Sequence, residues 1–462
     1  MTDLMYRPGA PARPPAGNRH RRPAPRRTVL HAVPLIAQVL IWGGAAGVLA
    51  MWWADTASVV GPAGWLTGAG RIAGLLAGYA CAVLLALMAR IPLLDRAVGT
   101  DRLARWHAMG GRYTISLVLV HTLLILWGYA LTGRTGVLNE TATVVLHYPD
   151  MLKATAGFAL FVLTAVLSAR AARRRVSYET WHYLHFATYA AIFLAFGHQL
   201  ANGADFVGHL PAQVAWYALY GTVAALLCWY RFLKPVRAAR RHRLRVAEVR
   251  PEAPGVVSVY MTGERLDELR ARPGQFFRWR FLTPGLWWSA SPYSLSAPAD
   301  ARFLRITVKG VGRHSAALAR LSPGTRVWAE GPYGGLTPDR ARAGKSLLLA
   351  GGVGITPLRT LFELLPGDTE LIYWARRPQD LALRNELDAV AAARGARVHY
   401  SVSHPGGHAL PLTSQTLTGQ VPDIAERDVY LCGPPGMTEA ATSALREAGV
   451  PRGRIHHESF AF

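Results

Sequence analysis

The segment WHAMGGRYTISLVLVH, which runs from Trp106 to His121, places His107 and His121 near the two ends of one strongly apolar stretch. An ionisable side chain inside a membrane-spanning helix is costly, so each of these histidines needs a physical reason. One interpretation is a pair of core histidines that form local hydrogen bonds. The other is metal ligation at two depths of a lipid bilayer, and the rest of the sequence bears on that choice.

The first half of the chain contains six apolar segments that are each long enough to cross roughly 30 Å of hydrocarbon. They cover residues 33–53, 71–89, 107–131, 152–171, 178–200 and 212–233. Basic residues gather before the first segment, in loops 90–105 and 170–175, and after the sixth segment, whereas the alternate loops contain almost none beyond Arg134. Because positively charged loops stay on the cytoplasmic side, we expect an all-α six-helix bundle in the plasma membrane with both termini in the cytoplasm.

The composition argues against several other classes of protein and of metal site. A net charge of +23 would suit a nucleic-acid-binding protein, but the arginines flank apolar segments, so we expect no nucleic-acid partner. The three cysteines lie far apart and fit no disulfide framework, zinc site or iron–sulfur cluster. Residues 1–31 are rich in Pro and Arg and cannot bury a core, which predicts a disordered basic tail before a transmembrane domain over residues 32–236.

A second histidine pair, His185 and His198, lies in the fifth segment. If the helices alternate in direction, His107 and His185 share a cytoplasmic level, and His121 and His198 share an outer level. Residues fourteen apart fall near one helix face, whereas residues thirteen apart miss it by about 140°, so the fifth helix needs local overwinding or tilt. The matched levels favour two haems, each bound by one imidazole from either side. Arg112 either pairs with a haem propionate or extends to the membrane interface.

The second half of the chain has a different pattern. Short alternating segments bounded by Gly, Pro and Asp predict an antiparallel β-barrel domain over residues 237–342. Strand-like and helical runs then alternate, which predicts an α/β domain with a parallel sheet over residues 343–462. The segment VKGVGRHSAAL contains Lys309 near its start. Farther along it, Gly312 and Ser315 stand at a predicted helix start, where backbone N–H groups can bind pyrophosphate. A glycine turn with a serine cap explains that element equally well.

The segment LLLAGGVGITPLRTL is the most specific motif of the soluble half. Its three glycines, Gly351, Gly352 and Gly354, follow a buried strand and precede a helix, so the backbone can approach a dinucleotide pyrophosphate closely. Three arginines follow the second strand of this domain, where an adenosine ribose would lie. They are Arg376, Arg377 and Arg384. Arginine there favours the 2′-phosphate of NADPH, although a solvated basic face is the alternative.

Taken together, the histidine spacings and the soluble motifs resemble the ferric reductase and NADPH oxidase family, and the resemblance covers residues 33–462. In SPYSLSAP it implies that Tyr293 and Ser294 contact the flavin, whereas Ser291 stands where Arg or His is usual and leaves FAD versus FMN open. The glycine loop resembles the nicotinamide-binding loop of ferredoxin reductases, which adds Thr356 and Pro357 to the expected binding residues.

The same resemblance assigns roles near the C-terminus. Cys432 and Gly433, in LCGPPGM, resemble the second nicotinamide loop, where the cysteine lies near the hydride-transfer site; a buried strand-end thiol is the alternative. A C-terminal aromatic residue is expected to cover the flavin ring until nicotinamide displaces it. Phe462 is the candidate, Phe460 is an alternative, and Glu458 is a candidate proton or hydrogen-bond partner.

The expected protein is therefore a membrane oxidoreductase in which NAD(P)H reduces FAD and two b-type haems carry single electrons outward. The acceptor stays open between oxygen, a ferric chelate, and a quinone or protein partner, as do NADPH versus NADH and the oligomeric state. A haem-free, membrane-anchored flavin reductase is one rival hypothesis. A transporter or channel with a regulatory nucleotide domain is another.

Overall fold

The computed structural model describes residues 26–57, 59–169, 178–402 and 411–458. The chain divides into two compact units, one ending at Phe232 and the other starting again at Leu233. Most of the predicted tail and the basic run 170–175 lie outside the described residues, and α1 begins at Arg26.

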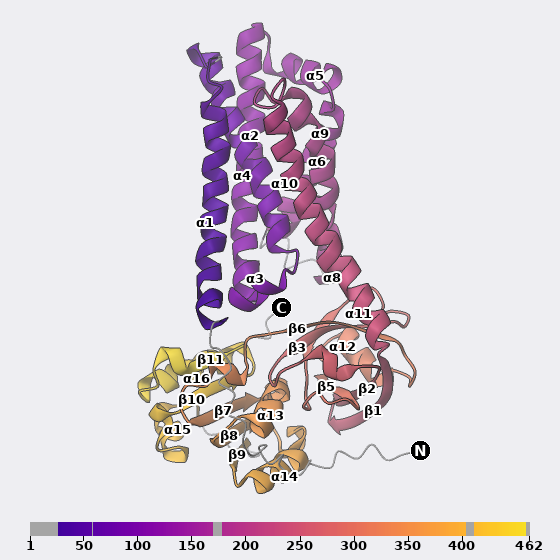
Figure 1. Cartoon of the computed structure of the whole chain (residues 1–462), viewed down its shortest axis with the longest axis vertical. Coiled ribbons are helices and arrows are strands. Elements are labelled where there is room, and N and C mark those ends of the chain that lie inside the picture. The colour runs from indigo at the N-terminus through magenta and orange to yellow at the C-terminus, as the bar shows by residue number, and fades with distance from the viewer. Residues whose placement is uncertain (1–25, 58, 170–177, 403–410, 459–462) are drawn as a thin grey trace. The chain divides into compact units, whose positions relative to one another are not determined.

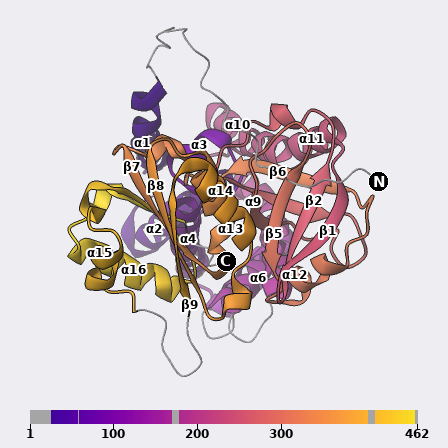
Figure 2. The same cartoon turned by 90° about the horizontal axis from the view of Figure 1, so that it is seen from below.

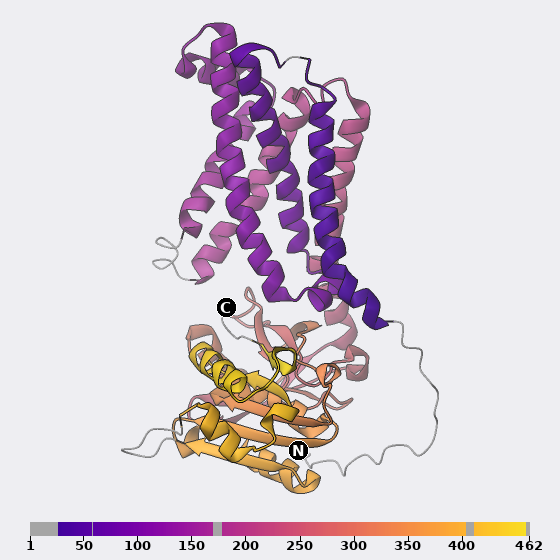
Figure 3. The same cartoon turned by 90° about the vertical axis from the view of Figure 1, so that its left-hand side faces the viewer.

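The first unit is a bundle of helices that run side by side (Figures 1 and 3). The long helices are α1 (Arg26–Trp53), α2 (Gly61–Leu87), α4 (Thr100–Gly133), α6 (Met151–Ser168) and α10 (Leu210–Leu227). The shorter ones are α3 (Pro92–Ala97), α5 (Val137–His147), α8 (Tyr178–His185) and α9 (Ala187–Asn202). Within the described residues, five helices are long and apolar enough to cross a membrane. The fifth of these continues from α10 through a π-helical turn (Cys228–Leu233) into α11 (Lys234–His242).

The expected span over residues 178–200 is divided into α8 and α9 at Phe186, so neither part reaches the length of a spanning helix. The Phe186 N–H donates to the Tyr183 carbonyl at 3.0 Å, and the Tyr189 N–H donates to the Phe186 carbonyl at 3.0 Å. Hydrogen bonds to the third preceding residue wind the chain more tightly than an α-helix does. Local overwinding is therefore present at Phe186, between His185 and His198, and it supplies part of the rotation that the thirteen-residue spacing requires.

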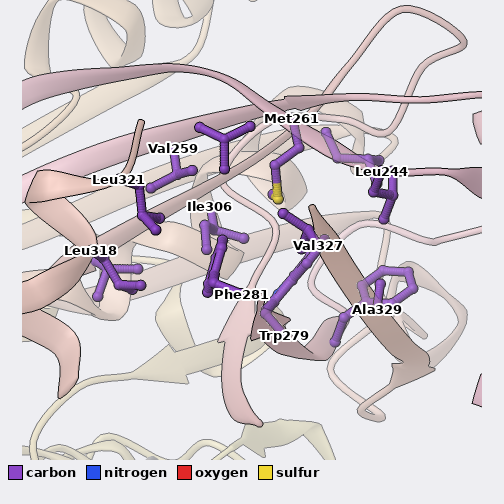
Figure 4. Close-up of a cluster of buried hydrophobic side chains, with 14 of the residues drawn as sticks. Leu244, Val259, Met261, Trp279, Phe281, Ile306, Leu318, Leu321, Val327 and Ala329 are labelled. Atoms are coloured by element: carbon purple, nitrogen blue, oxygen red, sulfur yellow. The ribbon is translucent and has the colours of Figure 1, made fainter. Parts of the chain in front are cut away.

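The second unit begins with two antiparallel sheets, each of three strands. One has the order β1-β2-β5 and the other β4-β3-β6. Their bounds are β1 (Arg245–Ala253), β2 (Val256–Thr262), β3 (Phe276–Phe281), β4 (Ser291–Ser294), β5 (Leu304–Lys309) and β6 (Val327–Tyr333). Both sheets contribute to one apolar core, in which Trp279 and Phe281 face Ile306 and Met261 (Figure 4). Two isolated bridges link the edges of these sheets: Arg245 of β1 pairs with Arg326 just before β6, and Leu295 just after β4 pairs with Ile306 of β5. In the described residues the expected β-barrel domain thus consists of two sheets around a shared core, and no closed barrel is seen.

The rest of the second unit is a parallel sheet of five strands in the order β11-β10-β7-β8-β9. The strands are β7 (Lys345–Gly351), β8 (Asp368–Ala375), β9 (Arg397–Val402), β10 (Asp428–Cys432) and β11 (Ile455–His457). Helices α13 (Ile355–Leu364) and α14 (Arg384–Arg394) cover one face, and α15 (Ser414–Gln420) and α16 (Pro435–Glu447) cover the other (Figure 2). Alternate residues of β7 explain this arrangement, because Leu348 packs with Leu358 of α13 whereas Leu349 packs with Leu445 of α16.

A buried ion-pair network joins the two antiparallel sheets to the parallel-sheet domain. Arg305 of β5 is fully buried and donates to the Glu386 carboxylate of α14, with one of its two hydrogen bonds at 2.8 Å. Arg359 of α13, also fully buried, donates to the same carboxylate at 3.0 Å. Burial alone would raise the pKa of Glu386, but the hydrogen bonds and charges of the two arginines outweigh it and hold that pKa below its ordinary value.

Candidate cofactor sites

The structure brings the four membrane histidines together as the two predicted pairs. The ring centroids of His107 and His185 lie 6.0 Å apart, and those of His121 and His198 lie 6.4 Å apart. Two imidazoles that share one metal at about 2 Å per bond place their centroids about 6 Å apart. No cluster of three or more His, Cys, Asp or Glu side chains occurs in the described part of the chain. Each pair therefore offers two protein ligands, and it suits a metal whose remaining ligands come from a prosthetic group.

Hydrogen bonds select the ring nitrogen that each α4 histidine can offer. His107 Nδ1 lies 3.2 Å from the Leu84 carbonyl oxygen, and His121 Nδ1 lies 2.8 Å from the Gly70 carbonyl oxygen. A carbonyl oxygen only accepts, so both bonds require the proton on Nδ1 and leave Nε2 with its lone pair. Neutral imidazole in this tautomer is a metal ligand, so the geometry fits axial ligation.

Arg112 lies on α4 with an exposed side chain, and its carbonyl accepts a hydrogen bond from the Ser116 hydroxyl at 3.1 Å. Both interpretations of this arginine therefore remain. A different arginine, Arg71, is paired within the bundle, and the sequence pattern did not single it out. Arg71 lies well inside α2, not at the start of a span, and pairs with Asp205 at 2.6 Å and Asp55 at 2.9 Å. A lone arginine in an apolar segment could have indicated this ion pair from the sequence, because such a charge needs an acidic partner.

The candidate flavin residues lie on β4. Tyr293 pairs with Phe277 of β3, its carbonyl accepts from the Trp279 indole N–H at 2.9 Å, and burial raises the pKa of its phenol. Ser294 is 3% exposed, and its hydroxyl has no hydrogen-bond partner among the described residues. A buried hydroxyl without a partner is unfavourable. A bound polar group such as the flavin ring would satisfy it, so these residues fit the expected flavin.

The segment after β5 that is expected to bind pyrophosphate forms hydrogen bonds within itself. The Ser315 hydroxyl accepts from the Val311 N–H at 3.0 Å and from the Gly312 N–H at 3.1 Å. This is the serine cap that the alternative interpretation describes, at the start of the short helix α12 (Arg313–Ala317). Lys309 is exposed at the end of β5. A phosphate at this element would have to share or replace the serine contacts.

The two glycine loops meet at the carboxyl edge of the parallel sheet. Strand β10 pairs with β7, which sets Cys432 beside Ala350. A Cβ on Gly433 would lie 3.4 Å from the Gly351 Cα, and a Cβ on Gly354 would collide with the Cys432 carbonyl. Gly352 has a φ of +53°, in the left-handed region that favours glycine. The loop conformation thus depends on these glycines.

Helix α13 starts directly after the first of these loops. The Thr356 hydroxyl donates to the Val353 carbonyl at 3.0 Å, and Pro357 is buried in the first turn. Proline is favourable there because its missing N–H would have no helical partner. The N–H groups around this helix start are the ones that face a dinucleotide in this type of loop.

Three groups from distant parts of the sequence meet around Cys432. The thiol is fully buried, which raises its pKa well above the ordinary value, and it donates to the Glu458 carbonyl at 4.0 Å. A Cβ on Gly334, in the turn after β6, would lie 3.1 Å from the Glu458 carboxylate. Glu458 therefore lies where the two domains of the second unit meet. Phe460 and Phe462 lie outside the described residues.

The three arginines expected near an adenosine ribose are all exposed, after β8 or at the start of α14. Arg377 pairs with Asp380 at 2.9 Å. Arg384 lies 3.8 Å from Asp388 and covers the Tyr400 ring at 5.0 Å. These contacts are those of a solvated basic surface, so the 2′-phosphate role of Arg376, Arg377 and Arg384 stays a prediction.

Comparison with known proteins agrees with this geometry. Residues 73–196 match the family model of the ferric reductase like transmembrane component, and residues 348–443 match the oxidoreductase NAD-binding domain. The combination of these two domains matches the ferric reductase and NADPH oxidase-like family that the sequence resembles. These matches are to a transmembrane component and to an oxidoreductase domain, and a module of the ferredoxin-reductase type supports binding of FAD and NAD(P)H.

Relatives with known names match part of this chain. An NADPH oxidoreductase of Mycobacterium tuberculosis is 30% identical and covers 53% of this chain, which spans 68% of that protein. Ferredoxin–NADP reductase B of Sorangium cellulosum is 33% identical over 36% of this chain and 77% of its own length. The chain spans 64%, 63% and 64% of three other reductase components. A solved flavohemoglobin from Malassezia yamatoensis is 18% identical, with a TM-score of 0.43, and covers 83% of this chain and 94% of its own.

Proposed function

We propose that the chain carries electrons from cytoplasmic NAD(P)H, through FAD and two b-type haems, to an acceptor outside the cytoplasm. When bound, FAD accepts a hydride as two electrons, and haem passes electrons one at a time, so both kinds of group are needed. The residues of the chain hold these groups in order and exclude water from them.

The observation that carries this proposal is the spacing of the histidine rings. Centroids at 6.0 Å and 6.4 Å leave room for one metal ion within each pair. His107 and His185 would hold the inner haem, and His121 and His198 the outer haem. Along α4 the two levels are about 21 Å apart, which would carry electrons across much of the hydrocarbon layer.

The flavin is assigned to β4 and the elements beside it. Tyr293 would pack against the ring and Ser294 would bond to it, which is supported by the buried hydroxyl that lacks a partner among the described residues. Lys309, Gly312 and Ser315 would lie near the phosphates, with the serine exchanging its local contacts for them. Since Ser291 supplies no positive charge there, the choice of FAD over FMN rests on the family.

The nicotinamide cofactor is assigned to the carboxyl edge of the parallel sheet, at the loops of Gly351 and Gly433. Cys432 would lie beside the hydride-transfer site as a neutral thiol, because burial raises its pKa well above physiological pH. It would therefore shape the site and donate a weak S–H hydrogen bond without acting as a nucleophile. Glu458 would serve as a hydrogen-bond or proton partner, and Phe462 would cover the flavin until nicotinamide binds.

The direction of electron flow follows from the charge pattern of the loops. Basic residues before the first segment and after the sixth support a cytoplasmic reductase half, in which case the outer histidine pair would face the acceptor. Oxygen and a ferric chelate are the acceptors we propose first, with the plasma membrane as the location. A quinone or a protein partner would require the same outer haem.

The experiment uses the full-length protein purified in detergent. We expect a Soret band from two low-spin haems per chain and bleaching of flavin absorbance when NADPH or NADH is added without oxygen. His121→Ala and His198→Ala should each remove one haem. His147→Ala is the matched control, because this exposed histidine bonds only to the Thr143 carbonyl of its own helix at 3.3 Å.

Addition of oxygen or ferric citrate to the reduced protein then identifies the acceptor by the reoxidation rate. A protein that binds flavin but shows no Soret band would refute the haem pathway and favour a haem-free anchored reductase. A protein whose flavin is not reduced by either nicotinamide would refute the oxidoreductase assignment itself.

A further inference from the structure

Helix α2 contacts both α4 histidines through its backbone. The Gly70 carbonyl oxygen lies 2.8 Å from His121 Nδ1, and the Leu84 carbonyl oxygen lies 3.2 Å from His107 Nδ1. Leu84 follows Gly70 by the same fourteen residues that separate the two histidines. Because the order of the contacts is reversed between the helices, α2 and α4 run antiparallel in one register. A single helix therefore serves both levels.

The outer contact depends on a residue without a side chain. A Cβ on Gly74 would lie 2.6 Å from His121 Nδ1 and 2.8 Å from Cε1, closer than non-bonded atoms approach. The imidazole thus lies directly against the α2 backbone, one turn after Gly70. The two helices are equally close at Gly70, because a Cβ on Gly70 would lie 2.9 Å from the Ile125 side chain of α4.

We propose that Gly74 and the Gly70 carbonyl are the positioning groups of the outer axial ligand, an inference that rests on the haem ligation proposed above. Gly74 provides the space for the ring of His121, and the carbonyl of Gly70 accepts the Nδ1 proton. The bond fixes the tautomer and turns Nε2 toward His198. It also makes the imidazole a more electron-rich ligand, as partners of ligating histidines do in other metal sites.

The inner level has the same arrangement with a weaker bond, at 3.2 Å against 2.8 Å. The Leu84 side chain also occupies the space beside Gly110, whose Cβ would lie 2.8 Å from Leu84 Cδ2. No glycine of α2 is required against the ring of His107. Substitution at Gly74 should therefore affect the outer haem and leave the inner one unchanged.

The first test compares Gly74→Ala with Gly47→Ala in the full-length protein. Gly47 lies in α1, where an added Cβ has no atom within 4 Å, so it controls for an extra methyl group in a membrane helix. Electron paramagnetic resonance and a redox titration follow the two haems separately. We expect Gly74→Ala to change the g-values of one low-spin signal and move one of the two midpoint potentials to a more positive value. Two unchanged haems in Gly74→Ala would overturn the proposal.

The second test keeps Gly74 and so remains available if Gly74→Ala does not accumulate. In His121→Gly produced with imidazole in the medium, the free imidazole replaces the missing ring, so that the outer haem is retained. The bound imidazole can donate its N–H to the Gly70 carbonyl, whereas 1-methylimidazole, exchanged in its place, has no N–H to donate. We expect imidazole to bind at least about tenfold more tightly in an optical titration. Equal affinity would overturn the proposal. A wild-type protein without haem would instead refute the proposed function, so the two failures are distinguishable.

Discussion

Replacing Arg305 by methionine tests whether the buried ion-pair network holds the two domains of the reductase half together. Arg305 is fully buried, and besides Glu386 it donates to the Tyr260 hydroxyl at 3.1 Å and the Ser296 carbonyl at 2.6 Å. The Arg305→Met change leaves Glu386 with Arg359 as its remaining partner in this network. Removing one partner of a buried ion pair costs about 3–5 kcal/mol, and the remaining arginine places this case near 3.

A loss of about 3 kcal/mol should lower the unfolding temperature of a unit of this size by about 6–12 °C. The assay is the release of flavin fluorescence on heating the full-length protein, at one scan rate for all variants. Arg302→Met is the matched control, because Arg302 is 77% exposed and pairs with Asp300 at 3.0 Å, a surface pair worth less than about 1 kcal/mol. If both variants released flavin at the same temperature as the wild type, the reasoning about the network would be wrong.

Three further predictions follow from single contacts. Ser294→Ala should weaken flavin binding about two- to tenfold in an equilibrium titration, because the buried hydroxyl loses one hydrogen bond to the ligand; unchanged affinity would exclude that bond. Gly354→Ala should raise the KM for NAD(P)H without loss of flavin, since its Cβ collides with the Cys432 carbonyl; an unchanged KM would show that the loop adjusts freely. The hydrogen bond from Arg427 lowers the pKa of Asp423 from 3.8 to about 2. This carboxylate should therefore add up to about 2 kcal/mol of stability above pH ~4, lost as the pH falls toward 2, and Asp423→Asn should flatten that part of the pH profile of unfolding.

The pairing of His185 with His107 could be predicted from local patterns in the sequence. The apolar lengths, the arginine clusters and the histidine spacings are local properties of the sequence, so they were sufficient to predict the bundle and the two levels. The break at Phe186 was not predictable, because whether a helix overwinds depends on what packs around it. The same limit applies to α5, an amphipathic helix in a segment that was interpreted as a loop.

Arg305 and Glu386 illustrate the contacts that sequence cannot specify. They are separated by 81 residues, and each reads in isolation as a charged residue in a strand or on a helix surface. Only docking of the α/β domain against the antiparallel sheets brings them together, with Arg305 fully and Glu386 partly buried. The serine cap at Ser315 is the converse case, since its partners lie three and four residues away and the sequence already allowed it.

The sequence by itself predicted the order of the domains, six apolar spans, the two histidine levels and the glycine loops, because each prediction depends on residue type and short spacing. The tertiary structure alone decided which nitrogen of His107 and His121 is free, since their partners are backbone carbonyls of α2. A carbonyl is present at every residue and so leaves no trace in the sequence. What the sequence does contain is Gly74, whose missing side chain acquires a reason only when the ring of His121 lies against it.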